Sequence, residues 1–303
     1  MQKQEKGDKT MDKMIKKDTF NVSLEIFPPK KEEEFAGAFE LLDKLALLKP
    51  DFISVTFGAG GSENSETTLS IANRIKTVCG VESVVHLPCI NLTKEEATSL
   101  LTDFRAAGIE NILALRGDKV EGKKPCKDFL HASDLIQFIK EFDALNQDSS
   151  EQSFNIIGAC YPEGHPDSPS LVDDIKNLKI KVDAGVSHLI SQLFFDNNCF
   201  YDFLEKTKLA GINVPIEAGI MPVVNKAQIE RMVSRCGVDL PKKYTAMMEK
   251  YGDNAEAIRD AGIAYAIDQI VDLVSQGVDG IHLYTMNNPF VAKKITQAVE
   301  SLF

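Results

Sequence analysis

Closely spaced cysteines are missing from this 303-residue sequence, whose six cysteines stand at positions 79, 89, 126, 160, 199 and 236. No two of them form a CxxC pair. Structural zinc sites need paired ligands, and secreted disulfide frameworks need small, cysteine-dense domains. The five histidines also lack the i, i+4 spacing of a helical metal site. We therefore expect buried thiols in a reducing compartment and no metal site.

Long apolar runs are missing as well. No stretch approaches the ~20 residues that a transmembrane helix requires, and the N-terminus has no apolar signal segment. We expect a soluble, cytoplasmic protein without a membrane partner. Positive charge is in deficit, because 34 Lys and Arg oppose 45 Asp and Glu and the net charge is −11. Nucleic acid is therefore not an expected partner, although local donors can still bind a small anion.

Residues 1–18 differ in composition from the rest of the chain, being rich in lysine and poor in hydrophobic residues. Such a segment cannot bury enough apolar surface to fold, so we expect a disordered N-terminal tail. No linker rich in Pro, Gly or Ser divides the remainder. We therefore expect one domain over 19–303.

From residue 21 onward, short β-rich runs alternate with runs of helical periodicity, as in successive βα units. The predicted strands are 22–27, 52–56, 84–88, 111–115, 155–160, 188–194, 215–219 and 280–284. The predicted helices after them are 34–48, 66–78, 94–107, 131–145, 171–184, 200–210, 226–235 and 290–302. Two more helices are expected within 241–275. This pattern predicts the α/β class and a single (β/α)8 TIM barrel, with extra helices between strands 7 and 8.

The alternative fold is an open, doubly wound sheet. Such a sheet normally carries a GxGxxG turn after its first strand, where it binds a dinucleotide. Here the first strand runs into FPPK at 27–30 instead. Eight βα units also suit closure better than an open sheet, so the barrel is the favoured prediction.

Polar residues alternate with Val, Ile and Leu along several of the predicted strands, although barrel lumens are ordinarily filled with branched apolar residues. Glu25 lies on the polar face of strand 1, His86 on that of strand 3 and His282 on that of strand 8. A buried carboxylate is costly without a partner or a purpose. Glu25 is either part of a structural ion-pair network or, as we favour, an acid for proton transfer, since desolvation favours the protonated form.

Asp118 is the second candidate carboxylate, in the sequence LRGD directly after the fourth strand. Catalytic residues of TIM barrels lie at such C-terminal strand ends. A structural turn is the alternative interpretation. The glycine-rich loop at 58–62 could bring backbone amides to a ligand, although it matches neither the P-loop nor the dinucleotide fingerprint.

Ten short motifs follow one another in order along the chain, the first five at the predicted strand ends or at the helix starts beyond them. They are SLEIFPP at 23–29, SVT at 54–56, HLPC at 86–89, LRGD at 115–118, ASD at 132–134, YPEGHP at 161–166, KVDAG at 181–185, QLFFD at 192–196, GIMP at 219–222 and YTMN at 284–287. Together they closely resemble the bacterial type of methylenetetrahydrofolate reductase. The resemblance covers residues 20–303, and ten motifs in register make it highly specific.

The resemblance implies a flavoprotein that binds FAD without a covalent link. In such a protein NADH or NADPH reduces the flavin and leaves. The substrate 5,10-methylenetetrahydrofolate then takes the hydride and becomes 5-methyltetrahydrofolate, which feeds methyl groups to methionine synthesis. The resemblance also implies a homo-oligomer. No acidic residue or arginine that would bind the nicotinamide ribose can be identified in the sequence. Both NADH and NADPH therefore stay open as hydride donors.

The motif match also assigns site residues. Those expected at FAD are Thr56, His86, Leu115, Arg116, Gly117, Asp118, Ala132, Ala159, Tyr161, His165, Asp174, Asn177 and Lys181. Those expected around the folate are Ser23, Glu25, Asp118, Gln192, Gln228 and Tyr284.

Glu25 and Asp118 are the expected catalytic residues. Opening the folate methylene bridge needs a proton on the leaving nitrogen, a general-acid task that suits Glu25 directly or through one water. Asp118 is expected near the flavin ring and the pterin, where it can bind the pterin and modulate the developing charge. Arg116 and Lys181 are expected partners of the anionic parts of the cofactor.

Four positions depart from the family pattern. Ile180 stands where a second base is expected beside Lys181, Met232 replaces a folate-stacking aromatic residue, and Asn288 replaces an arginine. Glu217 on strand 7 is also off pattern, without an explanation from the sequence. Two other function classes stay open: a pterin-binding barrel that transfers a group without flavin, and a barrel that only binds a ligand or partner.

Overall fold

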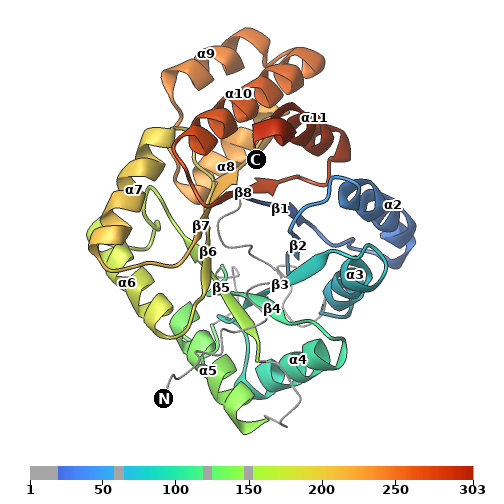
Figure 1. Cartoon of the computed structure of the whole chain (residues 1–303), viewed down its shortest axis with the longest axis vertical. Coiled ribbons are helices and arrows are strands. Elements are labelled where there is room, and N and C mark those ends of the chain that lie inside the picture. Colours follow the sequence, from blue (N-terminus) through green and yellow to red (C-terminus); the bar gives the residue numbers. More distant parts are fainter. Residues whose placement is uncertain (1–19, 58–64, 119–124, 147–152, 303) are drawn as a thin grey trace, which may run out of the picture.

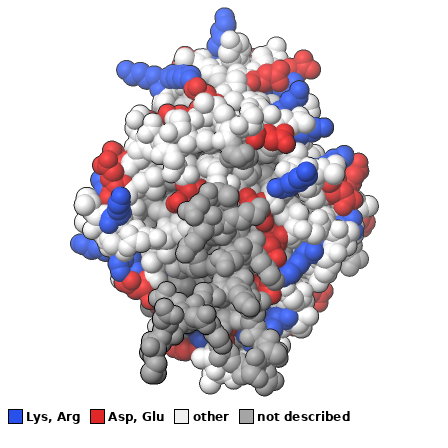
Figure 2. Space-filling view, viewed as in Figure 1, with Lys and Arg blue, Asp and Glu red and all other residues white. Residues whose placement is uncertain are grey.

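The computed structural model describes residues 20–57, 65–118, 125–146 and 153–302. The tail expected at 1–18 and the glycine-rich loop at 58–62 lie outside the described residues. Among the described helices, none has the length and apolar character needed to cross a bilayer. Charges of both signs are interspersed on the described surface in Figure 2, and neither sign gathers into one large patch on this face.

Eight parallel strands close into a barrel in chain order, and β8 pairs back onto β1 (Figure 1). The strands are β1 (Asn21–Ile26), β2 (Phe52–Val55), β3 (Glu82–Pro88), β4 (Asn111–Leu115), β5 (Asn155–Cys160), β6 (His188–Ser191), β7 (Ile216–Ile220) and β8 (Gly280–Tyr284). In the closing pair, Ser23 lies opposite His282 and Glu25 opposite Tyr284. The predicted TIM barrel is confirmed, and the open sheet is excluded.

Helices surround the ring of strands (Figure 1). They are η1 (Glu32–Glu34), α2 (Phe35–Ala46), α3 (Ser65–Thr77), α4 (Lys94–Ala106), α5 (Ala132–Leu145), α6 (Leu171–Asp183), α7 (Asn197–Leu209), α8 (Lys226–Cys236), α9 (Lys242–Tyr251), α10 (Ala255–Ser275), α11 (Pro289–Val299) and η3 (Glu300–Leu302). Thr93 and Glu96 form a capping box at the start of α4. The two helices expected within 241–275 are α9 and α10.

The end of β6 is the largest error among the predicted strands, because β6 stops at Ser191 rather than at residue 194. The reason is tertiary. The Ser191 hydroxyl accepts the Gly219 N–H at 2.8 Å, and the Ser191 carbonyl accepts the Tyr284 hydroxyl at 2.8 Å. These bonds take the place of a continued ladder between β6 and β7. Gln192 therefore lies just beyond the strand.

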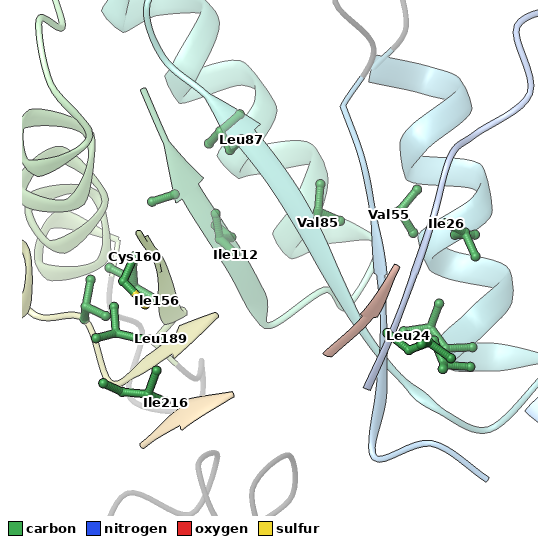
Figure 3. Close-up of a cluster of buried hydrophobic side chains, with 14 of the residues drawn as sticks. Leu24, Ile26, Val55, Val85, Leu87, Ile112, Ile156, Cys160, Leu189 and Ile216 are labelled. Carbon is green, nitrogen blue, oxygen red and sulfur yellow. The ribbon is translucent and has the colours of Figure 1, made fainter. Parts of the chain in front are cut away.

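The main hydrophobic core lies between the barrel and its helices. Figure 3 shows branched side chains of alternate strand positions in this layer, among them Leu24, Val55, Val85, Ile112 and Leu189. A smaller cluster fills the lumen with Phe52, Val84, Leu113, Ile157 and Ile190. Polar residues occupy the remaining lumen positions, as the alternation along the strands predicts.

The chain between β7 and β8, together with residues just after β6, builds a separate apolar cluster, which we call the apolar wall. Its buried members are Leu193, Phe195, Met221, Val223, Ile229, Val238, Tyr244, Met248 and Ile258. A Cβ atom on Gly262 of α10 would lie 1.6 Å from the Val223 carbonyl oxygen, so only glycine permits this close approach. Tyr284 packs against the wall from the end of β8. The wall therefore flanks the C-terminal mouth of the barrel at β6 to β8.

Candidate active site

Glu25 points into the upper lumen, where only 9% of the residue is exposed. One carboxylate oxygen, Oε2, lies 3.5 Å from His86 Nε2 and 3.7 Å from His282 Nε2. The two imidazoles belong to β3 and β8, so the carboxylate lies between side chains from both sides of β1. The inward, buried placement expected for Glu25 is confirmed. An acid in this position is shielded from bulk water yet close to the mouth.

His86 is a buried imidazole that stays neutral near neutral pH. Burial lowers the pKa of His86 from its ordinary 6.5 to about 4; the Glu25 carboxylate opposes this shift and His282 adds to it. Among the described residues, no group has hydrogen-bond geometry to His86 Nε2, which is buried. The Nε2 atom of this neutral ring faces Glu25 without hydrogen-bond geometry, so it is a suitable contact for a polar ligand atom.

The low pKa of His86 predicts a loss of stability in acid. Between pH 6.5 and about 4 this ring is protonated in the unfolded chain but not in the folded protein. The free energy of unfolding therefore falls as the pH is lowered through this window. The full effect is on the order of 3 kcal/mol, at about 1.4 kcal/mol for each pKa unit. Urea unfolding at pH 7 and pH 4.5 measures it. In His86→Gln the loss between the two pH values should be clearly smaller, and an unchanged loss would contradict the assignment.

A second carboxylate, Glu217 of β7, lies deeper in the lumen and is fully buried. Its Oε2 accepts a hydrogen bond from the Ser23 hydroxyl, which also lies 2.6 Å from His282 Nδ1. Its Oε1 lies 3.4 Å from Nε2 of His188, the first residue of β6. Ser23 is thus placed one layer below Glu25, with its hydroxyl between Glu217 and His282.

The chain beyond β8 fastens the end of β1. The Thr285 hydroxyl donates to the Glu25 carbonyl at 2.6 Å. The Asn287 side chain accepts the Phe27 N–H and donates to the Phe27 carbonyl, both at 2.9 Å. Asn287 adopts a left-handed backbone with φ of 55°, which asparagine tolerates better than most residues. These bonds fix the backbone that carries Glu25.

Five residues that were expected at FAD come together beyond β4 and β5, and we call them the β5 cluster: Arg116, Tyr161, His165, Asp174 and Lys181. The Tyr161 and His165 rings meet edge to face at 4.7 Å between centroids. Burial, then the charge of Arg116, lowers the pKa of His165, and Lys181 acts in the same direction. Both cations therefore lie within electrostatic reach of one ring.

Lys181 contributes a buried ammonium group to the β5 cluster. Burial lowers its pKa, and its Nζ donates to the Ala159 carbonyl at 2.6 Å. Arg116 pairs with Asp167 at 2.9 Å, and Asp174 accepts the Ser168 hydroxyl at 2.8 Å. The β5 cluster thus presents two cations and several hydrogen-bonding groups at the barrel mouth. Such a set can bind a phosphate group.

The LRGD turn places Asp118 on the same side of the barrel. Gly117 has φ of 83°, and a Cβ atom there would lie 2.7 Å from Pro88 Cβ, so the turn requires glycine. Asp118 is exposed, and its charge contributes to a raised pKa of Tyr161, for which burial is the main cause. Asp118 therefore lies near the β5 cluster.

The other residues expected at FAD are spread around the mouth. Thr56 follows β2, Leu115 ends β4 and Ala132 begins α5, all partly buried. Asn177 is exposed on α6, at helical spacing from Asp174 and Lys181, so these three share one face of the helix.

The other residues expected around the folate, Gln192, Gln228 and Tyr284, lie at β6 to β8. Gln192 accepts the Leu193 N–H at 2.9 Å through its side chain, and Gln228 is partly buried in the first turn of α8. Burial, then the Glu25 charge, raises the pKa of the Tyr284 hydroxyl well above its ordinary value, so that group stays a donor.

The positions that depart from the family pattern differ in their surroundings. Met232 packs against the apolar wall, and Asn288 caps α11 by accepting the Val291 N–H at 3.2 Å. Ile180 is exposed on α6. His188 was not among the expected site residues, yet its ring lies in the lumen beside Glu217.

Comparison with known proteins finds similar sequences and similar folds. The sequence model of the family described as "Methylenetetrahydrofolate reductase" matches residues 10–300. The 5,10-methylenetetrahydrofolate reductase of Escherichia coli (strain K12) is 38% identical over 267 residues, which cover 88% of this chain and 86% of that protein. "Methylenetetrahydrofolate reductase (NADH) 1" of Arabidopsis thaliana is 37% identical over 278 residues, which cover 88% of this chain.

Some relatives are longer than this chain, and the similar solved structures have low sequence identity to it. The chain spans about half the length of the plant relatives it matches, 46% for the Arabidopsis protein. A solved protein from Clostridium thermocellum, described as binding two copies of 5-methyl-5,6,7,8-tetrahydrofolic acid, has a TM-score of 0.65 at 15% identity and covers 97% of this chain and 98% of its own. At that identity the likeness is one of fold.

Proposed function

Because this chain belongs to the methylenetetrahydrofolate reductase family, we propose that it reduces 5,10-methylenetetrahydrofolate to 5-methyltetrahydrofolate with hydride from a reduced nicotinamide, passed through bound FAD. The observation that carries the proposal is the position of Glu25. This acid is buried between two imidazoles at the mouth of the barrel, on the strand that carries SLEIFPP. Hydride transfer to a folate methylene bridge requires an acid of this kind.

The residues present fit FAD by their chemistry. Arg116 and Lys181 offer two cations for a diphosphate, and Tyr161 and His165 offer hydrogen bonds and ring surface beside them. His86 offers a buried nitrogen with no hydrogen-bond partner among the described residues. When bound, FAD supplies the two-electron chemistry that no side chain of this chain can provide. The β5 cluster would hold the anionic part, with His86 nearer the barrel axis.

Glu25 then serves the folate half of the reaction. Its protonated carboxyl group donates to the leaving nitrogen as the methylene bridge opens, so that the carbon becomes an electrophile for hydride. The bonds from Thr285 and Asn287 hold the backbone of β1 during this transfer. The lumen excludes bulk water from the carboxyl group, which keeps the proton available for the substrate.

Asp118 and the apolar wall have supporting roles in the proposal. Asp118 is exposed near the β5 cluster and can accept hydrogen bonds from a pterin ring. The apolar wall with Met232 offers the surface against which the aromatic part of the folate would pack. Methionine can serve here because its flexible thioether makes favourable contacts with aromatic rings. Gln192 and Gln228 lie at this side of the mouth and can form hydrogen bonds with the polar edge of the ligand.

The purified protein tests the proposal directly. It should be yellow or bind added FAD with a flavin spectrum, and anaerobic NADH or NADPH should bleach that spectrum. Methylenetetrahydrofolate should then restore the colour. Initial bleaching rates compare the two donors, and we expect NADH to be the faster because the matched plant relatives are named for it. A colourless protein that also fails to bind added FAD contradicts the proposal.

A further inference from the structure

Two carboxylates in the lumen are joined through one imidazole. His282 Nε2 lies 3.7 Å from Glu25 Oε2, and His282 Nδ1 lies 3.8 Å from Glu217 Oε2. The Ser23 hydroxyl lies between Nδ1 and Glu217, 2.6 Å from the ring nitrogen. Glu217 and His282 are fully buried, and Glu25 is nearly so. At these distances in a buried site, the charge of each carboxylate acts strongly on the imidazole between them.

The hydrogen bonds decide where the protons stand. The Ser23 hydroxyl donates its one proton to Glu217, so it can only accept from His282 Nδ1. Nδ1 therefore carries a proton, and Nε2 is the ring atom that exchanges a proton with Glu25. This is the arrangement in which a carboxylate behind an imidazole stabilises its charged form.

We propose that Glu25 shares its proton with His282, and that the buried charge of Glu217, acting through Ser23, keeps this proton in the lumen. The inference rests on the function proposed above and extends it to a positioning residue, Glu217. Glu25 touches the substrate, whereas Glu217 acts only through His282. The acid of the folate half-reaction is thus a three-residue unit with one exchangeable proton.

The other groups that face this unit do not supply the compensating charge. His86, from β3, is kept neutral by burial, which lowers its pKa to about 4. Ser54, from β2, lies 3.5 Å from His282 Nε2 and is uncharged, and Tyr284, from β8, keeps its proton. His188, from β6, faces Oε1 of Glu217 and is farther from Glu25. Glu217 is therefore the charge that decides the proton affinity of the unit.

The proton balance is simple. The O–H bond of Glu25 breaks as the N–H bond on the leaving folate nitrogen forms, which leaves a carboxylate. When the shared proton stands on His282 instead, the Nε2–H bond breaks and the Glu25 O–H bond forms before that transfer. Solvent returns one proton to the unit after the product leaves. No electrons move in these steps, and the one proton consumed is the one that the overall reduction requires.

The test replaces Glu217 with Gln, which keeps the shape and removes the charge. Loss of a buried negative charge lowers the proton affinity of the unit, so the pH above which folate reduction declines should move down by about one unit or more, given the ~1–3 units typical of a charge at this distance. Glu217→Asp keeps the charge and should stay close to the parent. Reduction of the flavin by nicotinamide should keep its pH profile in both variants.

A second readout needs no reaction. The chain has only five histidines, so histidine-labelled protein gives few ring signals, and His282→Gln identifies the one to follow. That signal should titrate at lower pH in Glu217→Gln than in the parent, and Ser23→Ala should give a smaller shift in the same direction. Equal titration in parent and Glu217→Gln, with an unmoved pH limit of folate reduction, overturns the inference. A parent that reduces no folate contradicts the proposed function instead, and the ring signals still decide the shared proton.

Discussion

Glu25→Gln should reduce the rate of folate reduction by about 100- to 10,000-fold, the range by which a positioned general acid accelerates a reaction. The amide matches the carboxyl group in shape, so His86 and His282 keep a polar neighbour and the barrel should fold normally. An amide cannot give up a proton to the leaving nitrogen. Reduction of the flavin by nicotinamide needs no such proton and should stay within a few-fold of the parent.

Anaerobic stopped-flow measurement of the two half-reactions separates these effects. Glu82→Gln is the matched control, because Glu82 is the first residue of β3, at the opposite end of the barrel, with Lys76 at 3.7 Å. That variant should retain both half-reactions. If Glu25→Gln reduces folate near the parent rate, the acid is another group. If both half-reactions fall equally, the residue acts on flavin binding rather than on proton transfer.

Lys181→Met should weaken FAD binding by about 10- to 100-fold, since a hydrogen bond to a charged group contributes about 1.5–3 kcal/mol and 1.4 kcal/mol corresponds to tenfold in affinity. Methionine keeps most of the buried stem of Lys181, so the packing of α6 against β5 should change little. The lost group is the ammonium that now contacts the Ala159 carbonyl. Its low pKa reflects a desolvated cation, and such a cation gains more from a phosphate than an exposed one does.

Titration of the flavin-free protein with FAD, followed by flavin fluorescence, measures this loss. Lys179→Met is the matched control on the same helix, because Lys179 pairs with exposed Asp183 at 2.5 Å and lies outside the β5 cluster. That control should bind FAD like the parent. The expected loss should also shrink at high salt, where ionic interactions are screened. Equal affinity in both variants would remove Lys181 from the cofactor site.

Strand alternation and eight βα units were sufficient to predict the barrel and the inward position of Glu25. Both follow from local periodicity, which the sequence carries directly. The members of the β5 cluster were expected from the motif match rather than from periodicity, and two of them, Asp174 and Lys181, lie on α6. The early end of β6 could not be predicted from the sequence. Ser191 ends this strand through hydrogen bonds to Gly219 and Tyr284, and these bonds depend on the closed barrel.

The contacts of Glu217 could not be predicted from the sequence, for another reason. Its pairing with Ser23 and His188 depends on the stagger between β6, β7, β8 and β1, which decides which inward residues share a layer. Local periodicity says that a residue points inward but not which neighbour it meets. Asn288 is a milder case, because its position just before Pro289 could have identified it as a helix cap.

The fastening of β1 by Thr285 and Asn287 has a consequence for the order of events on the ribosome. The bonded residues are 260 positions apart, so at about 5–20 residues per second some ten seconds to a minute separates their synthesis. During this interval one edge of β1 has no partner strand and is open to wrong pairing. The β5 cluster emerges within it. A nascent chain would therefore assemble its cofactor-side residues before its acid is fixed in place.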